Sequence, residues 1–124
     1  MIFKTQELEK EWEKLKDDVK CIVLEAETVA KSYELDICIT CIFRDDQDQK
    51  RLYDKLKKPY IPTLHSWWKA CDFGLRGNGD KIACRMAILA LNKKYSYGNK
   101  NIKKSIIFHD IGAGEHFHVQ QPLA

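Results

Sequence analysis

The sequence turns from loop to strand within the segment Thr63-Leu64-His65-Ser66-Trp67-Trp68-Lys69-Ala70-Cys71-Asp72-Phe73. Pro59 and Pro62 mark the loop that precedes it. A strand of about residues 70–75 is expected to follow, and closely spaced glycines break the chain after it. His65 and Asp72 are seven residues apart, on either side of this transition. A single loop-to-strand segment therefore carries two side chains of the kinds that bind metal ions.

Three other segments show the apolar periodicity of amphipathic helices. Residues 5–30 predict one long helix with Thr5 as its N-cap, and residues 46–57 predict a short helix. Residues 80–95 predict a third, with Asp80 as its N-cap. The long helix is expected to pack on the rest of the protein through Trp12, Leu15 and Val19. The inner face of the third is expected to hold Ile82, Met86, Leu89 and Ala90.

The remaining segments predict a small sheet. Strands are expected at residues 35–43, 70–75, 105–108 and 115–120, and the last two flank a turn with two glycines, as a hairpin would. This order of elements indicates an α+β fold, with a small antiparallel sheet and helices packed on one side. The length of 124 residues fits a single domain that spans residues 1–124.

The net charge of +3 is modest, but basic residues are unevenly placed. Residues 76–104 hold eight basic side chains and one acidic side chain, Asp80. The simpler interpretation is a solvated basic face, and the alternative is attraction to a polyanion such as nucleic acid or an anionic cell wall. The chain has no helix-turn-helix turn, zinc-finger spacing or aromatic RNA motif, so nucleic acid is not the expected partner.

The five cysteines are odd in number, and most lie in apolar runs, which favours buried reduced thiols. Cys38 and Cys41 form a C-x-x-C pair, but on a strand the two side chains are expected to face opposite ways, so no structural zinc is expected there. The chain shows neither a signal-peptide pattern nor a membrane-spanning stretch. We therefore expect a monomer made in the cytoplasm, without a membrane partner, that reaches the cell wall only if something else delivers it.

The four histidines lie in two short segments, with His65 in one and His109, His116 and His118 in the other. His116 and His118 are two residues apart on a predicted strand, so they share a face. One histidine from the loop, Asp72 and one histidine from a neighbouring strand would make a three-ligand zinc site. A fourth position left open to water is typical of catalytic zinc rather than structural zinc.

Three segments together resemble motifs of the D-alanyl-D-alanine metallopeptidases, a class that includes bacterial carboxypeptidases and phage L-alanyl-D-glutamate endolysins. The segment from Thr63 to Asp72 resembles the family's Ser-x-His-x-x-Gly-x-Ala-x-Asp motif. Gly114-Glu115-His116-Phe117-His118-Val119-Gln120 resembles its second motif, which is Glu-x-x-His or His-x-His. Ile39-Thr40-Cys41-Ile42-Phe43-Arg44 resembles a strand that ends in Thr-Ser-x-x-Arg.

The resemblance implies a hedgehog/D-Ala-D-Ala-peptidase-like fold and a zinc peptidase that cleaves peptidoglycan stem peptides. It implies His65, Asp72 and His118 as zinc ligands, and Arg44 as a contact to the substrate or to the developing oxyanion. The catalytic base is either His116, if the motif is His-x-His, or Glu115, if it is Glu-x-x-His. Strand alternation favours His116, because it shares a face with His118.

The resemblance is incomplete at four positions. Trp68 stands where the family usually has Gly, and Thr63 stands where it often has Ser. Lys69 replaces the usual Arg, and Cys41 replaces the usual Ser. We expect these changes to alter substrate fit without touching a ligand.

Further side chains have open roles. His109 and Asp110 are candidates to hydrogen-bond a ligand imidazole, and Trp67 and Trp68 could either line a peptide groove or pack in the fold.

Two functions of different classes stay open. The first is a zinc peptidase of phage or prophage type, acting as an endopeptidase or as a carboxypeptidase on stem peptides. The second is a zinc-containing binding module of the same fold that contacts a polyanion without catalysis, and the basic segment at residues 76–104 is its support.

Overall fold

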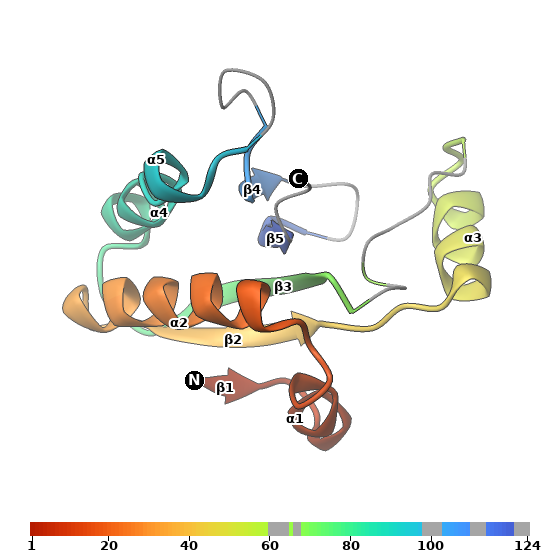
Figure 1. The fold of residues 1–124 in the computed structure, drawn as a ribbon, viewed down its shortest axis with the longest axis horizontal. Helices are drawn as coiled ribbons and strands as arrows, with labels where there is room; N and C mark the ends of the chain where they lie inside the picture. Colours follow the sequence, from red (N-terminus) through yellow and green to blue (C-terminus); the bar gives the residue numbers. More distant parts are fainter. Residues whose placement is uncertain (60–64, 66–67, 98–102, 110–113, 121–124) are drawn as a thin grey trace.

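The computed structural model describes residues 1–59, 65, 68–97, 103–109 and 114–120. Within them a five-stranded mixed sheet has the strand order β1-β2-β3-β5-β4 (Figure 1). The strands are β1 (Ile2–Phe3), β2 (Asp36–Cys41), β3 (Ala70–Arg76), β4 (Ile106–His109) and β5 (His116–Gln120). The helices are α1 (Gln6–Trp12), α2 (Asp17–Ser32), α3 (Asp46–Lys55), α4 (Lys81–Leu89) and α5 (Asn92–Tyr95). The fold is therefore α+β, with helices packed against the sheet.

The four strands predicted from the sequence are present, and they pair with one another in antiparallel fashion. The sheet as a whole is mixed, because β1 pairs with β2 in parallel, with Ile2 opposite Cys38. The prediction of a purely antiparallel sheet is therefore wrong at this edge. A strand of two residues is too short to show an alternation of apolar and polar side chains, so the sequence pattern could not reveal it.

The single helix predicted over residues 5–30 is in fact two helices. Thr5 caps α1 as expected, and its hydroxyl accepts a hydrogen bond from the Leu8 backbone amide. The chain then turns, and the Lys16 amide donates to the Trp68 carbonyl at 3.0 Å before α2 begins. The apolar spacing hides this break, because Leu15 within the turn is as buried as the residues of the helix.

The segment at residues 80–95 also divides, into α4 and α5. Asp80 is the N-cap of α4, as predicted. The predicted inner face is wrong, because Ile82 and Met86 are 66% and 67% exposed, while Cys84 and Ile88 are buried. The helix carries two apolar stripes at a spacing of four residues, and its packing against α2 and β4 decides which one is covered.

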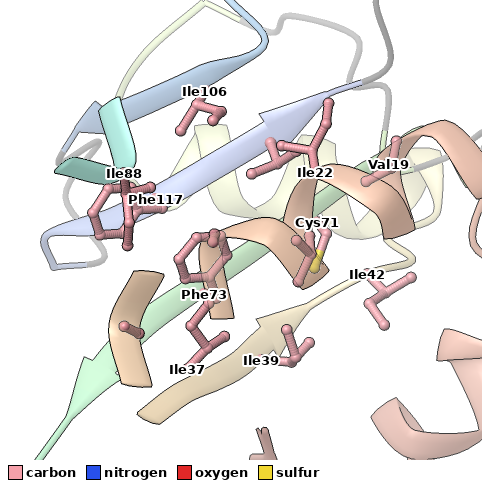
Figure 2. Close-up of a cluster of buried hydrophobic side chains, with 14 of the residues drawn as sticks. Val19, Ile22, Ile37, Ile39, Ile42, Cys71, Phe73, Ile88, Ile106 and Phe117 are labelled. Carbon is pink, nitrogen blue, oxygen red and sulfur yellow. The ribbon is translucent and has the colours of Figure 1, made fainter. Parts of the chain in front are cut away.

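The hydrophobic core lies between α2 and one face of the sheet. Figure 2 shows the side chains of this cluster, in which Phe73 of β3 stacks on Phe117 of β5 with ring centroids 4.9 Å apart. Val19 at the start of α2 is fully buried, as predicted, and Trp12 packs against the same cluster. No helix in the described ranges is both long and apolar enough to cross a membrane.

Candidate metal centre

The sheet face opposite the core carries a row of polar side chains. Phe73 and Phe117 are opposite each other on the core face, so Asp72 and His118, which are also opposite each other, point the other way. His116 is two residues from His118 and lies opposite His109 of β4. The register of three strands therefore gathers four polar side chains on one face: Asp72, His109, His116 and His118.

Asp72 is the centre of this group. Its Oδ1 lies 2.9 Å from Nδ1 of His118 and 3.1 Å from Nε2 of His65, which arrives from the segment before β3. Its Oδ2 lies 3.6 Å from Nε2 of His116. Asp72 and His65 are only 6% and 2% exposed. The structure thus brings together the three ligands expected from the sequence, His65, Asp72 and His118, with His116 beside them.

The other ring nitrogen of His65 and of His116 faces a backbone carbonyl. Nδ1 of His65 lies 2.9 Å from the Ile42 oxygen, and Nδ1 of His116 lies 2.8 Å from the Gly114 oxygen. A carbonyl oxygen only accepts, so each Nδ1 must carry the proton and donate it. Nε2 of each ring is then left to face Asp72. Histidines that bind metals are oriented in this way, by a hydrogen bond from the nitrogen that does not bind.

His118 is held by a short chain of hydrogen bonds. Its Nε2 donates to Oε1 of Gln120 at 3.1 Å, and Nε2 of Gln120 donates in turn to the Tyr97 hydroxyl at 2.6 Å. The Gln120 amide and the Tyr97 hydroxyl therefore hold the ring of His118 with Nδ1 towards Asp72. Neither Gln120 nor Tyr97 was singled out in the sequence, although Gln120 shares the strand face of His116 and His118.

The charges of this group are strongly coupled. Burial alone would lower the pKa of His65, but the hydrogen bond and the charge of Asp72 raise that pKa to about 10. Burial would raise the pKa of Asp72, but hydrogen bonds from His118 and His65 and their charges hold it well below its usual range. Without a metal ion, the site at neutral pH therefore holds an ionised carboxylate and a protonated His65.

Cys41 also belongs to this region. Its Sγ lies 3.7 Å from Nδ1 of His65, and Cys41, His65 and Asp72 each offer a ligand atom within 4.8 Å of the others. These three residues form a group suited to holding a metal ion. The expectation that the Cys41 substitution touches no ligand is therefore wrong. A β-bulge in β2 turns Cys41 to this face. The bulge contains neither glycine nor proline, so it could not be predicted from the sequence pattern.

A cleft of about 420 Å³ opens over the group, and its lining includes Cys41, Asp72 and both candidate bases, Glu115 and His116. Arg44 lines it as well. Nη1 of Arg44 donates to Oε1 of Gln49 at 2.8 Å, and its Nη2 lies 3.5 Å from Sγ of Cys41. Arg44 thus lies at the cleft next to Cys41, and its expected contact with the substrate or the oxyanion stays a prediction.

Trp68 lies in a different hollow. Its ring stacks on Phe43 with centroids 4.5 Å apart, and Nζ of Lys14 lies 5.4 Å from its centre. Its φ of 60° lies in the left-handed region, which glycine adopts most easily.

Three further residues were candidates for the site: His109, Asp110 and Trp67. The ring of His109 lies 4.8 Å from that of His116 and 5.8 Å from that of His118, between centroids, so it adjoins the proposed ligands. Trp67 and Asp110 lie outside the described residues.

Comparisons of the chain with models of protein families, with curated proteins and with solved structures found no match.

Proposed function

We propose that this protein is a zinc-dependent peptidase that hydrolyses an amide bond in peptidoglycan stem peptides. The observation that carries the proposal is the arrangement around Asp72. Three imidazoles direct one nitrogen at this carboxylate, and the other nitrogen of each ring lies within hydrogen-bonding distance of an oxygen atom. The three motifs that resemble the D-alanyl-D-alanine metallopeptidases supply the reaction class.

The donor set suits zinc. His65, Asp72 and His118 would provide two imidazole nitrogens and one carboxylate oxygen, a combination found in catalytic zinc sites with an open fourth position. The nitrogens lie 3.1 and 2.9 Å from Oδ1 of Asp72, whereas donors around a tetrahedral ion with bonds of about 2.0–2.2 Å are roughly 3.4 Å apart. Small side-chain movements would therefore admit the ion. Magnesium and calcium are less suitable, because both prefer oxygen ligands.

The chain's own residues have separate roles in the proposal. When bound, zinc supplies Lewis acidity towards a water molecule and an amide carbonyl. His116, held by the Gly114 carbonyl, takes the proton of the attacking water at Nε2 and passes it to the leaving amine. Glu115 lines the same cleft and is the alternative base. Arg44 offers its guanidinium to the oxyanion or to a substrate carboxylate.

The cleft carries more basic than acidic side chains. Lys4, Arg44 and Arg76 line it from three different segments of the chain, against Asp72 and Glu115. Carboxylate-bearing peptides, such as stem peptides, would be attracted to such a surface. Both modes of cleavage, internal and at the carboxyl terminus, are compatible with an open cleft of this size.

The test is to incubate the zinc-loaded protein with purified peptidoglycan and to analyse the released fragments by mass spectrometry. We expect new amino and carboxyl termini within stem peptides, and none with His118→Ala, which lacks a ligand. Cys21→Ser, which changes an exposed cysteine, serves as the matched control and should cleave like the wild type. Zinc binding without any cleavage would contradict the peptidase proposal and favour the non-enzymatic binding module.

A further inference from the structure

Cys41 faces the cleft because of an irregularity in β2. Ile39 is paired with Phe73, so in a regular ladder the next pair would be Thr40 with Asp72. A register shift between Ile39 and Cys41 makes Cys41 the partner of Asp72 instead. The bulge therefore places a thiol directly opposite the carboxylate at the centre of the candidate metal site.

The bulge also changes the relation between the two cysteines of β2. Cys38 is paired with Gly74 and Cys41 with Asp72, and these two partners lie on the same face of β3. The expectation that Cys38 and Cys41 face opposite ways is therefore wrong. Cys38 is buried next to β1, whereas Cys41 is half-buried and lines the cleft.

The contacts of Cys41 are those of a potential donor. Its Sγ belongs, with one ligand atom of His65 and one of Asp72, to a set of atoms within 4.8 Å of one another. The 3.7 Å contact of Sγ with His65 is made to Nδ1, the nitrogen that carries the proton, so it leaves Nε2 free to face the metal. With a zinc–sulfur bond of about 2.3 Å and zinc–nitrogen or zinc–oxygen bonds of about 2.0–2.2 Å, donors in a tetrahedral site lie about 3.3–3.8 Å apart. For Cys41, His65 and Asp72, contraction from 4.8 Å to that range requires a shift of the order of 1 Å, which a cysteine side chain at the cleft surface can make.

We propose that Cys41 is a thiolate donor to the metal ion bound at Asp72, in the fourth position beside His65, Asp72 and His118, so that Cys41 must yield this position to water before hydrolysis. This inference rests on the metal site of the proposed function, but not on its hydrolytic activity. Metal binding forms a sulfur–metal bond and releases the thiol proton to solvent. A thiolate in the set favours thiophilic ions such as cadmium, and it excludes magnesium and calcium more strongly than imidazole and carboxylate alone.

Cobalt(II) is a direct probe, because it replaces zinc and absorbs visibly when bound. We expect cobalt-loaded wild type to show a sulfur-to-cobalt charge-transfer band in the near ultraviolet together with the visible bands of the bound ion. Cys41→Ser should lose the charge-transfer band and keep the visible bands, while Cys21→Ser should keep both. Cys41→Ser should also lower zinc affinity by at least about 10–100-fold, the loss known for partners one step removed from the metal.

Two results separate this inference from the proposed function. Visible bands without a charge-transfer band in the wild type would show that a metal binds without sulfur, which overturns the role of Cys41 and leaves the proposed function standing. No cobalt binding at all would overturn both.

A second measurement needs only the wild-type protein. Zinc should protect Cys41 of the wild type from alkylation, mapped by peptide mass, while exposed Cys21 should react equally with and without zinc. Equal alkylation of Cys41 in the zinc-loaded and zinc-free proteins would contradict ligation.

Discussion

Asp72 and His118 are direct partners across β3 and β5, and Nδ1 of His118 lies 2.9 Å from Oδ1 of Asp72, although 46 residues separate them in the chain. The site is therefore a product of strand register. A slip of one residue between these strands would turn His118 towards the core and Phe117 towards the cleft. The stack of Phe73 on Phe117 on the other face stabilises the register that the site requires.

The Gln120 amide should tune metal affinity without binding the metal. Gln120→Ala removes the acceptor for His118 Nε2, so the imidazole loses the hydrogen bond that orients it. We expect zinc affinity to fall by about 10–100-fold, measured by competition with a chromophoric chelator. Tyr97→Phe, one hydrogen bond further away, should have a smaller effect. Unchanged affinity in Gln120→Ala would mean that His118 is not a ligand through Nδ1.

The two candidate bases can be separated by substitution. His116→Ala should keep zinc and lower the hydrolysis rate by roughly 10²–10⁴-fold, because the proton acceptor is lost while the ligands stay. Glu115→Ala should have a milder effect, since Glu115 lies before β5 and outside the row of residues that face Asp72. Rates on purified peptidoglycan and zinc content of both variants decide the matter. A dead, zinc-loaded Glu115→Ala together with an active His116→Ala would reverse the assignment.

The metal-free protein should lose stability as the pH rises. The pKa of His65 is raised from 6.5 to about 10 in the folded state, so its contribution is complete below pH 6.5 and is lost as the pH rises towards 10. The depressed pKa of Asp72 has the opposite sign, and its contribution is lost only as the pH falls below the ordinary value of 3.8.

Denaturant unfolding of the metal-free protein at a series of pH values checks this. His65→Gln should flatten the alkaline decline. A wild type whose unfolding free energy is constant between pH 6.5 and 10 would show that Asp72 does not hold a proton on His65.

Replacement of two glycines by alanine should change the stability of the protein in different ways. A Cβ at Gly79 would lie 1.8 Å from the Tyr33 carbonyl oxygen, so the backbone must move, at a cost of about 1–3 kcal/mol or more. A Cβ at Gly74 would meet nothing within 4 Å, so Gly74→Ala should be neutral or stabilise by up to about 1 kcal/mol. Chemical unfolding of both variants tests the pair, and similar losses in both would contradict this account of the turn before α4.

Regular alternation made much of the site predictable. His116 and His118 are two residues apart on a strand, so their common face could be inferred from a period of two. That Asp72 lies opposite His118 depends on the register of β3 with β5, which a single strand does not reveal. His65 was linked to them only through the resemblance of its segment to a known motif, because its local sequence does not predict which strand the loop will contact. The structure brings it within 3.1 Å of Asp72.

The features that escaped sequence analysis depend on tertiary packing. The break before Lys16 follows from a hydrogen bond to Trp68, far along the chain. The burial of Cys84 rather than Ile82 depends on which stripe of α4 meets its neighbours. The bulge at Cys41 is a matter of pairing between strands, and a single strand read alone keeps its period across it.

The most direct test of the metal centre is the zinc content of purified protein after equilibration with zinc and removal of the excess. We expect about one zinc ion per chain in the wild type and in Ile107→Ala, which truncates the direct strand partner of His118 without removing a donor. We expect little or no zinc in Asp72→Ala and His118→Ala. A wild type without zinc, or a His118→Ala variant that retains the full zinc content, would contradict this expectation.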